Sequence, residues 1–280
     1  MSYAGPNAVM AEFWNETAGP TWVEFQDQLD NQVMPLGDEA LRALAPAAGE
    51  RILDIGCGCG QSSLQIAERV GPSGEVVGLD ISAPMLAVAR SRIPAAGGGR
   101  VSFVEGDAQT ADLGPETFDA AYSRFGWMFF GDPTAAFDNI RRALKPGGRL
   151  AMVTWRTFAE NPMFTAPAEA VRNMVEFPPP ADPTAPGPFR YGDVGDAVRV
   201  LTDAGFTEIA ARKFDAPVGA LNLDGALSLA LRLGPLGALL RETPGLTDKV
   251  RPAVRQALEG YQTAEGMKIP AAVWIVTARA

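Results

Sequence analysis

Residues 52–63, ILDIGCGCGQSS, carry the strongest structural signal in the chain. An apolar run typical of a buried strand contains Asp54 near its end, and glycines follow at positions 56, 58 and 60 before a polar segment that begins a helix. A strand that leads through a glycine-rich turn into a helix is typical of a nucleotide-type site. The amides of the turn and the helix N-terminus favour a negative group, and the missing side chains let a ligand contact the backbone.

Two classes of ligand compete for such a turn. A dinucleotide fingerprint, G-x-G-x-x-G, would require glycine at position 61 after Gly56 and Gly58, but that position holds Gln61. An acid just ahead of the turn, Asp54, is also a poor neighbour for a pyrophosphate, whereas it suits a ligand that carries an ammonium group. The pattern therefore favours the second class of ligand.

The sequence on both sides of this stretch alternates between strand-like and helix-like segments. Strands separated by helices predict right-handed βαβ units and a parallel sheet that is covered on both faces. The expected strands are 51–56, 74–82, 100–108, 117–125 and 149–155, and the expected helices are 61–70, 83–93 and 132–144.

The flanking segments predict additional helices and two further strands. A Pro-rich stretch, 160–189, is expected to hold a short helix in its first half and loop in its second. The remaining elements expected here are helices at 21–34, 38–44, 193–206, near 224–241 and 247–263, and strands at 208–216 and 271–279.

The composition of the chain excludes several classes of function. The 280 residues favour one large domain, and the net charge of −9 argues against nucleic acid or an anionic membrane surface as partner. We find no apolar run of membrane-spanning length and no signal-peptide pattern, and expect a cytoplasmic protein. The chain has no histidine, which removes the usual general base and the Ser-His-Asp triad. Its two cysteines, Cys57 and Cys59, are interpreted as free thiols in the turn.

Several segments together resemble a known family. LDIGCGCG (53–60) is similar to motif I of the class I S-adenosylmethionine-dependent methyltransferases, in particular bacterial small-molecule enzymes of the quinone-methyltransferase-like type. The segments that follow fit the same family in order and spacing over roughly residues 50 to 156. They are VVGLDIS (76–82), VEGDAQ (104–109), FDAAYSRFGWMFF (118–130) and ALKPGGRL (143–150).

The resemblance implies an α/β fold with a Rossmann-like seven-stranded sheet of order 3-2-1-4-5-7-6, its last strand antiparallel, with helices on both faces and a helical lid. It implies one methyltransferase domain over 1–280. The expected parts are an N-terminal helical cap (1–48), a core that binds the methyl donor (49–156), lid or substrate insertions (157–192 and 217–266) and a final strand (267–280).

The resemblance also implies S-adenosyl-L-methionine as cofactor, S-adenosyl-L-homocysteine as product, and no metal. Asp80 would hold the ribose hydroxyls, Asp107 the adenine amino group, and Ile81 with Met85 would sandwich the adenine. Alternatives stay open: Asp80 could be a helix cap, Asp54 a strand-end cap, Asp107 a solvated acid at a strand end, and Met85 a core residue. The cofactor residues expected are Asp54, Gly56, Gly58, Gly60, Asp80, Ile81, Met85, Gly106, Asp107, Ala108 and Ser123.

The acceptor site is expected beyond strands four and five, under the added helices. Arg124 is interpreted as a clamp for a polar or anionic ligand, with a solvated surface charge as the alternative. For the aromatic residues the alternative is core packing, which residues in the pattern of Trp22 and its helical neighbours more often form. No catalytic residue is identified; the candidates are Arg124, Tyr3 and Trp14. The substrate residues expected are Trp14, Trp22, Arg124, Phe125, Met128, Trp155 and Asn161.

These features predict a methyltransferase that acts on a small-molecule acceptor by in-line displacement, mainly through positioning and exclusion of water. Without histidine, an acceptor that is already nucleophilic is favoured. The alternatives are a protein that binds the donor or its product without catalysis and, less favoured, an NAD-dependent oxidoreductase. A monomer or homodimer is expected.

Overall fold

Seven strands form one mixed sheet in the order β3-β2-β1-β4-β5-β9-β6, and β9 runs antiparallel to both of its neighbours. The computed structural model describes residues 4–94, 100–179, 182–219 and 222–280. The strands are β1 Arg51–Ile55, β2 Glu75–Asp80, β3 Arg100–Glu105, β4 Phe118–Arg124, β5 Leu144–Trp155, β6 Thr207–Val218 and β9 Ile269–Arg279, with a small hairpin of β7 Gln262–Thr263 and β8 Gly266–Met267. Because β7 and β8 form a separate hairpin, β9 is the seventh strand of this sheet, and the order 3-2-1-4-5-7-6 expected from the sequence is confirmed.

Helices connect the parallel strands as the alternating pattern predicts. They are α4 Gln61–Val70, α5 Ala83–Ser91, α6 Pro133–Ala143 and α8 Val194–Asp203. The strand order reverses between β1 and β4, so right-handed crossovers place α4 and α5 on one face and α6 on the other. Asp132 caps α6 by accepting a hydrogen bond from the amide of Ala135 at 3.0 Å, and Pro133 occupies the first turn.

The N-terminal segment departs from the predicted helix boundaries. It comprises α1 Ala8–Glu12, the π-helix η1 Phe13–Thr17, α2 Ala18–Glu24 and α3 Gln26–Leu44. The helix is interrupted at Phe25, inside the predicted helix 21–34. By contrast, α3 continues through Pro35, where the sequence analysis predicted a gap between helices 21–34 and 38–44. Burial explains the difference: Leu36 and Leu41, on either side of Gly37, are fully buried against the sheet. The carbonyl of Gly37 also accepts a hydrogen bond from the Tyr122 hydroxyl of β4 at 3.0 Å.

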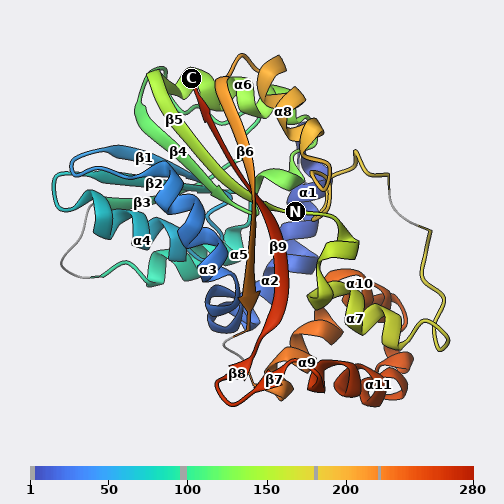
Figure 1. Cartoon of the computed structure of the whole chain (residues 1–280). Helices are drawn as coiled ribbons and strands as arrows, with labels where there is room; N and C mark the ends of the chain where they lie inside the picture. Colours follow the sequence, from blue (N-terminus) through green and yellow to red (C-terminus); the bar gives the residue numbers. More distant parts are fainter. Residues whose placement is uncertain (1–3, 95–99, 180–181, 220–221) are drawn as a thin grey trace.

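Four C-terminal helices gather beside the lower end of the sheet (Figure 1). They are α7 Pro162–Ala170, α9 Leu223–Arg232, α10 Gly234–Glu242 and α11 Thr247–Glu259, with short turns η2 Trp127–Phe129, η3 Phe158–Glu160 and η4 Pro244–Leu246. The single helix predicted near 224–241 is divided because Gly234 adopts a φ of +68° and Pro235 follows it. In the described parts of the chain no lone helix is long and apolar enough to cross a membrane; α9 and α10 meet those criteria as a pair bent by 60°.

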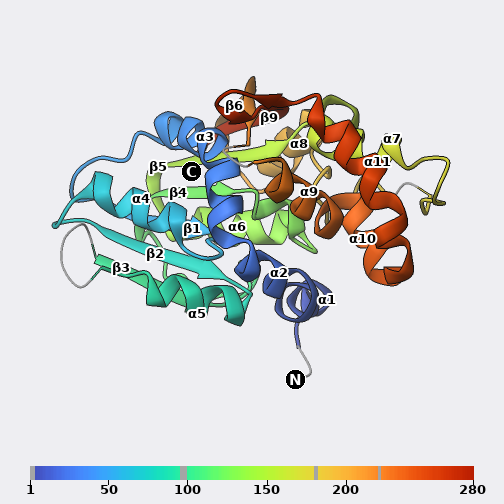
Figure 2. The same ribbon diagram turned by 90° about the horizontal axis from the view of Figure 1, so that it is seen from below.

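A continuous hydrophobic core joins the sheet to the added segments. It runs from α3 through the central strands to residues of α9, α10 and α11. Figure 2 shows α1 and α2 at one end of the sheet, with α9, α10 and α11 gathered to one side. Helix α3 and the C-terminal helices are thus held by the same core that stabilises the sheet. The division into cap, core and insertions stays a prediction.

Candidate active site

A cavity of about 1330 Å³ opens where β1, β2 and β4 end. Its lining combines the turns after β1, β2, β3 and β4 with residues of the N-terminal cap, of α7, α9 and α10, and of the segments 176–179 and 182–190. The change of strand order between β1 and β4 is the point where open α/β sheets bind ligands. A typical small-molecule pocket measures roughly 300–1,000 Å³, so this cavity has room for more than one ligand.

The glycine turn forms one side of the cavity. Gly56 and Gly58 line it with φ values of +66° and +54°, a region that side chains strain to enter. A Cβ on Gly56 would lie 2.7 Å from the Cα of Gly126, so the turns after β1 and β4 touch backbone to backbone. Gly60 does not line the cavity. A Cβ there would lie 2.7 Å from the ring of Phe103, so its role is packing rather than ligand contact.

Asp80, at the end of β2, faces the cavity beside the glycine turn. Its Oδ2 accepts a hydrogen bond from the amide of Gly58 at 2.7 Å, and its Oδ1 accepts one from the amide of Ser82 at 2.9 Å. Burial raises the pKa of Asp80 to about 6, and these amide hydrogen bonds oppose the shift. Each carboxylate oxygen retains acceptor capacity, so the group suits a ligand with two neighbouring hydroxyls.

The residues expected around an adenine ring come together in the same part of the cavity. Ile81, Met85, Gly106, Asp107 and Ala108 all line it, from the ends of β2 and β3 and the start of α5. The Oδ1 of Asp107 accepts a hydrogen bond from the amide of Gln109 at 3.0 Å, which orients the carboxylate. Met85 is buried, and its Cε would lie 2.8 Å from a Cβ on Gly58, so this side chain both packs and lines the cavity.

Two expected ligand residues lie behind the turn instead. Asp54 is fully buried and does not line the cavity; its Oδ2 accepts hydrogen bonds from Ser62 at 2.7 Å and Ser63 at 2.6 Å. Burial raises the pKa of Asp54. Ser123 donates to the carbonyl of Ile55 at 2.7 Å and thereby joins β4 to β1. The structure gives Ser123 a supporting role, because its hydroxyl bonds to β1. Asp54 bonds to α4 through Oδ2, but its buried Oδ1 has no hydrogen-bond partner among the described residues, so its contact with the donor stays a prediction.

The two cysteines stay protonated near neutral pH. Cys57 is buried in a small apolar cluster with Leu86, Ala89 and Phe103, and burial raises its pKa well above the ordinary value. Burial likewise raises the pKa of Cys59 to about 12. Because the thiolate is the reactive form, this environment agrees with a structural role for both thiols.

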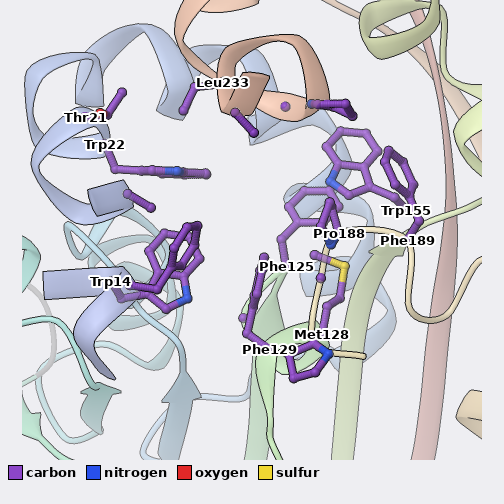
Figure 3. Close-up of a pocket in the computed structure, with 18 of the residues that line it drawn as sticks. Trp14, Thr21, Trp22, Phe125, Met128, Phe129, Trp155, Pro188, Phe189 and Leu233 are labelled. Carbon is purple, nitrogen blue, oxygen red and sulfur yellow. The ribbon is translucent and has the colours of Figure 1, made fainter. Parts of the chain in front are cut away.

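Aromatic side chains from distant parts of the sequence face one another across the remaining space (Figure 3). Trp14 and Trp22 come from the cap, with ring centroids 6.0 Å apart. Opposite them, the rings of Phe125 and Trp155 stack at 4.3 Å with planes 14° apart. Met128 and Phe189 lie on the same side as that stack, whereas the ring of Phe129 contacts Trp14 at 5.0 Å between centroids. The sequence analysis missed Phe129 and Phe189 because their places in the fold follow only from packing. Tyr3 lies outside the described residues.

Phe125 adopts a backbone conformation that is rare for its residue type. Its φ is +62°, in the left-handed region that costs a residue with a side chain roughly 1–2 kcal/mol. The amide of Phe125 donates to the carbonyl of Val153 at 3.2 Å, and its ring is held against Trp155. Strain held at the end of β4, beside the glycine turn, is typical of a functional position.

Arg124 is a buried charge that forms an ion pair, so it is not the solvated surface charge that the sequence left as the alternative. Its Nη2 lies 3.1 Å from Oδ1 of Asp30 on α3, and it also donates to the side chain of Gln61 at the start of α4. Arg124 and Asp30 both line the cavity and are about nine-tenths buried. Asp30 also pairs with Arg92 at 2.9 Å. The sequence analysis missed Asp30 because nothing in the helical pattern of α3 marks it as facing a cavity.

Asn161 does not line the cavity, so its expected contact with substrate is wrong. It is fully buried and joins two segments of the chain: its Oδ1 accepts from the amide of Ala272 at 2.8 Å, and its Nδ2 donates to the carbonyl of Thr157 at 3.0 Å. A second donation reaches the carbonyl of Ala272 at 3.2 Å. Asn161 therefore fastens the loop after β5 to β9.

The fold and the site define a Rossmann-like α/β protein of the class I methyltransferase type. Residues 52–148 match the family model described as a methyltransferase domain. The chain is 30% identical over 236 residues to nocamycin O-methyltransferase of Saccharothrix syringae, covering 84% of this chain and 75% of that protein. It is 38% identical over 133 residues to demethylmenaquinone methyltransferase of Clavibacter sepedonicus, covering 45% of this chain and 52% of that protein.

A solved structure supports the fold. Phosphoethanolamine N-methyltransferase 2 of Haemonchus contortus, in complex with S-adenosylhomocysteine, aligns with a TM-score of 0.58 and 18% identity over 99% of this chain and 60% of that one. The chain belongs to the class I S-adenosylmethionine-dependent methyltransferase family. It spans about half the length of the demethylmenaquinone methyltransferases that it matches.

Proposed function

We propose that this chain transfers a methyl group from S-adenosylmethionine to a small, largely apolar acceptor. The observation that carries the proposal is the position of Asp80 and the bare turn at Gly56 and Gly58 on one side of a cavity whose other side is aromatic. The side with Asp80 and the glycine turn suits a nucleoside, and the aromatic side suits an apolar ring or chain. Family membership supports the same reaction.

The residues that would hold the donor fit its chemistry. Asp80 offers its remaining acceptor capacity to the ribose hydroxyls, and Asp107 with the amide of Ala108 lies where an adenine edge can be read. Gly56 and Gly58 leave backbone exposed, and a side chain on Gly56 would strike Gly126. When bound, the donor supplies an activated methyl on a positively charged sulfur.

Asp30 and Arg124 extend this half of the cavity with a pair of opposite charges. A carboxylate 3.1 Å from a guanidinium, both facing the cavity, matches the ammonium and carboxylate of an amino acid. We therefore assign Arg124 to the amino-acid end of the donor, in place of the acceptor clamp that the sequence suggested. Its fixed position beside Gln61 would orient the donor toward the aromatic half.

The acceptor half would act by positioning and by excluding water. Phe125, Trp155 and Met128 on one side and Trp14 with Trp22 on the other leave an apolar space in which an acceptor atom can be aligned. Orienting two reactants can lower a barrier by roughly 7–11 kcal/mol. The cavity lining of the described chain includes acids and arginines but no tyrosine or lysine, so an acceptor that is already nucleophilic suits it best.

The N-terminal cap would close over the donor. Asn15 in η1 donates to the carbonyl of Ile81 at 2.9 Å and accepts from the amide of Ala83 at 2.8 Å. Ser82 donates to the carbonyl of Trp14 at 2.8 Å. These three bonds fasten the cap to the loop that follows Asp80, so closing the cap and forming the ribose site are coupled in this proposal.

The test has two stages. S-adenosylmethionine and S-adenosylhomocysteine are each expected to raise the melting temperature, while NAD is not; the reverse result would reject the donor assignment. Incubating the protein with labelled S-adenosylmethionine and a library of apolar metabolites then asks for a methylated product. A shift in melting temperature with no product across such libraries would favour a protein that binds the donor without catalysis.

A further inference from the structure

Arg190 places a positive charge in the aromatic half of the cavity. It follows Phe189 in the chain, lines the cavity and is partly buried. Its guanidinium donates a hydrogen bond to the main-chain carbonyl of Phe130. Across the described ranges of the chain, no carboxylate lies within ion-pair distance of it. One acceptor on a carbonyl leaves most of its five N–H donors available.

The other charges of the lining are already paired, bonded or exposed. Arg124 pairs with Asp30, and Arg172 is exposed near Glu169 at 3.9 Å. Arg241 is exposed and donates to the carbonyl of Arg232. Asp182, in the same loop as Arg190, uses its Oδ1 to accept from the amide and hydroxyl of Thr184, at 2.8 and 2.7 Å.

The position of Arg190 is fixed from two sides. Its guanidinium carbon lies 5.8 Å from the ring centroid of Tyr191. Tyr191 is fully buried and stacks on Trp127 at 4.2 Å, and the Trp127 Nε1 donates to the carbonyl of Val153 in β5 at 3.1 Å. The guanidinium is therefore held in place before any ligand arrives, which lowers the ordering cost of binding one.

We propose that Arg190 is a specificity-determining residue that binds an anionic oxygen group on the methyl acceptor. The acceptor would be a flat, apolar molecule with rings between Trp22 and the Phe125–Trp155 stack and an oxyanion at Arg190. A planar guanidinium matches a carboxylate, sulfonate or phosphate with parallel hydrogen bonds. In surroundings poor in water such bonds are strong, whereas a neutral acceptor would leave most of the N–H donors of Arg190 unused. The acceptor role rests on the proposed function; the anion site itself does not.

Two fluorescent probes with the same rings test the site. 1-Anilinonaphthalene-8-sulfonate carries a sulfonate, and N-phenyl-1-naphthylamine lacks it. The wild-type protein is expected to bind the sulfonate more tightly. Arg190→Met should weaken sulfonate binding about tenfold or more and leave the neutral probe within about twofold, since each 1.4 kcal/mol is tenfold in affinity. Arg190→Lys keeps the charge and should recover part of the loss.

Matched controls distinguish an anion site at Arg190 from general attraction to positive charge and from damage to the fold. Arg172→Met removes an exposed cation at the same opening and should change neither affinity. Trp22→Ala should weaken both probes, because it removes ring contact and no charge. Circular dichroism and binding of S-adenosylhomocysteine, expected unchanged in Arg190→Met, report the fold and the donor half separately.

Equal loss of both probes in Arg190→Met, or no loss of either, would overturn the proposal. So would a wild-type protein that does not prefer the sulfonate. If S-adenosylhomocysteine fails to bind while the sulfonate result holds, the anion site stands and the methyltransferase proposal falls.

Discussion

Asp30 and Arg124 lie 94 residues apart in the chain and form an ion pair of 3.1 Å at the side of the cavity. The pair joins α3 of the cap to the end of β4, and Gln61 at the start of α4 joins it through Arg124. The polar end of the site is thus assembled from three elements, and no single segment of sequence contains it.

This ion pair predicts that Arg124 binds the methyl donor and not the acceptor. Arg124→Met is expected to weaken the binding of S-adenosylhomocysteine at least about tenfold, because a charged hydrogen bond to the ligand carboxylate contributes roughly 1.5–3 kcal/mol. Titration calorimetry measures the change. Arg92→Met is the matched control: it also removes a partner of Asp30, but Arg92 does not line the cavity, so donor affinity should stay within about threefold. An unchanged donor affinity with a raised acceptor KM would instead restore the acceptor clamp.

The raised pKa of Asp80 predicts a pH dependence of donor binding. Ribose hydroxyls donate to the charged carboxylate, so affinity for S-adenosylhomocysteine should be constant above about pH 7 and fall as the pH drops through about 6, by up to tenfold per unit. Calorimetry from pH 5 to 8 measures this. Asp80→Asn should bind more weakly and lose the dependence; a variant that keeps the same pH profile would assign the titration to another group.

The raised pKa of Asp80 also predicts how the stability of the folded protein changes with pH. The pKa of Asp80 rises from 3.8 unfolded to about 6 folded, so between these values the folded protein keeps a proton that the unfolded chain has lost. The contribution of this group to the free energy of unfolding therefore declines as the pH rises from about 4 to 6, by about 3 kcal/mol in total. Urea unfolding of the wild type and of Asp80→Asn across this range isolates the contribution of Asp80.

The backbone of Phe125 predicts an unusual order of stability. Glycine at an ordinary position is less stable than alanine by about 0.5–1 kcal/mol, but at a φ of +62° it avoids the left-handed penalty. Phe125→Gly is therefore expected to unfold at higher urea than Phe125→Ala, although both lose the stack on Trp155. Phe129, which has no positive φ, supplies the control pair of variants. There Phe129→Ala is expected to unfold at higher urea than Phe129→Gly. The same order at both positions would show that Phe125 is not strained.

The hydrogen bonds of Asn161 predict a structural phenotype. Asn161→Ala leaves the amide and carbonyl of Ala272 without this partner and should lower the free energy of unfolding by about 1–3 kcal/mol. Because Asn161 does not line the cavity, affinity for S-adenosylhomocysteine should stay within about twofold once the protein is folded. A stable variant with impaired acceptor turnover would reinstate the contact with substrate that the sequence suggested.

The bonds between cap and core predict coupling between the cap and the donor. Asn15→Ala removes two hydrogen bonds to the loop after Asp80 and is expected to weaken donor binding about tenfold and to expose the first 20 residues to limited proteolysis. Asn139, which bonds to the carbonyls of Ala108 and Ala111 and not to the cap, serves for comparison: proteolysis of the N-terminus should not change in Asn139→Ala. Equal N-terminal cleavage in wild type and Asn15→Ala would remove the proposed role of the cap.

The fold and the donor half of the site could be predicted from the sequence because their signals are local. The glycines at 56, 58 and 60 need φ values that few other residues tolerate, and Asp80 and Asp107 occupy fixed places at the ends of their strands. Strand order follows from alternating elements and the hand of their crossovers. A helix break can be misplaced, as at Pro35, because burial against a sheet outweighs the local preference of a proline.

The tertiary structure alone shows which polar side chains face the cavity. Asp54, Ser123 and Asn161 are interpreted as ligand residues from the sequence, but none of the three lines the cavity. Ser123 and Asn161 bond to main-chain groups, and Asp54 bonds through Oδ2 to the start of α4. Asp30 and Arg190 carry no local signal, and their roles depend on which charges lie beside them after folding. A local motif constrains backbone conformation, whereas the partner of a buried charge is set by contacts between segments far apart in the sequence.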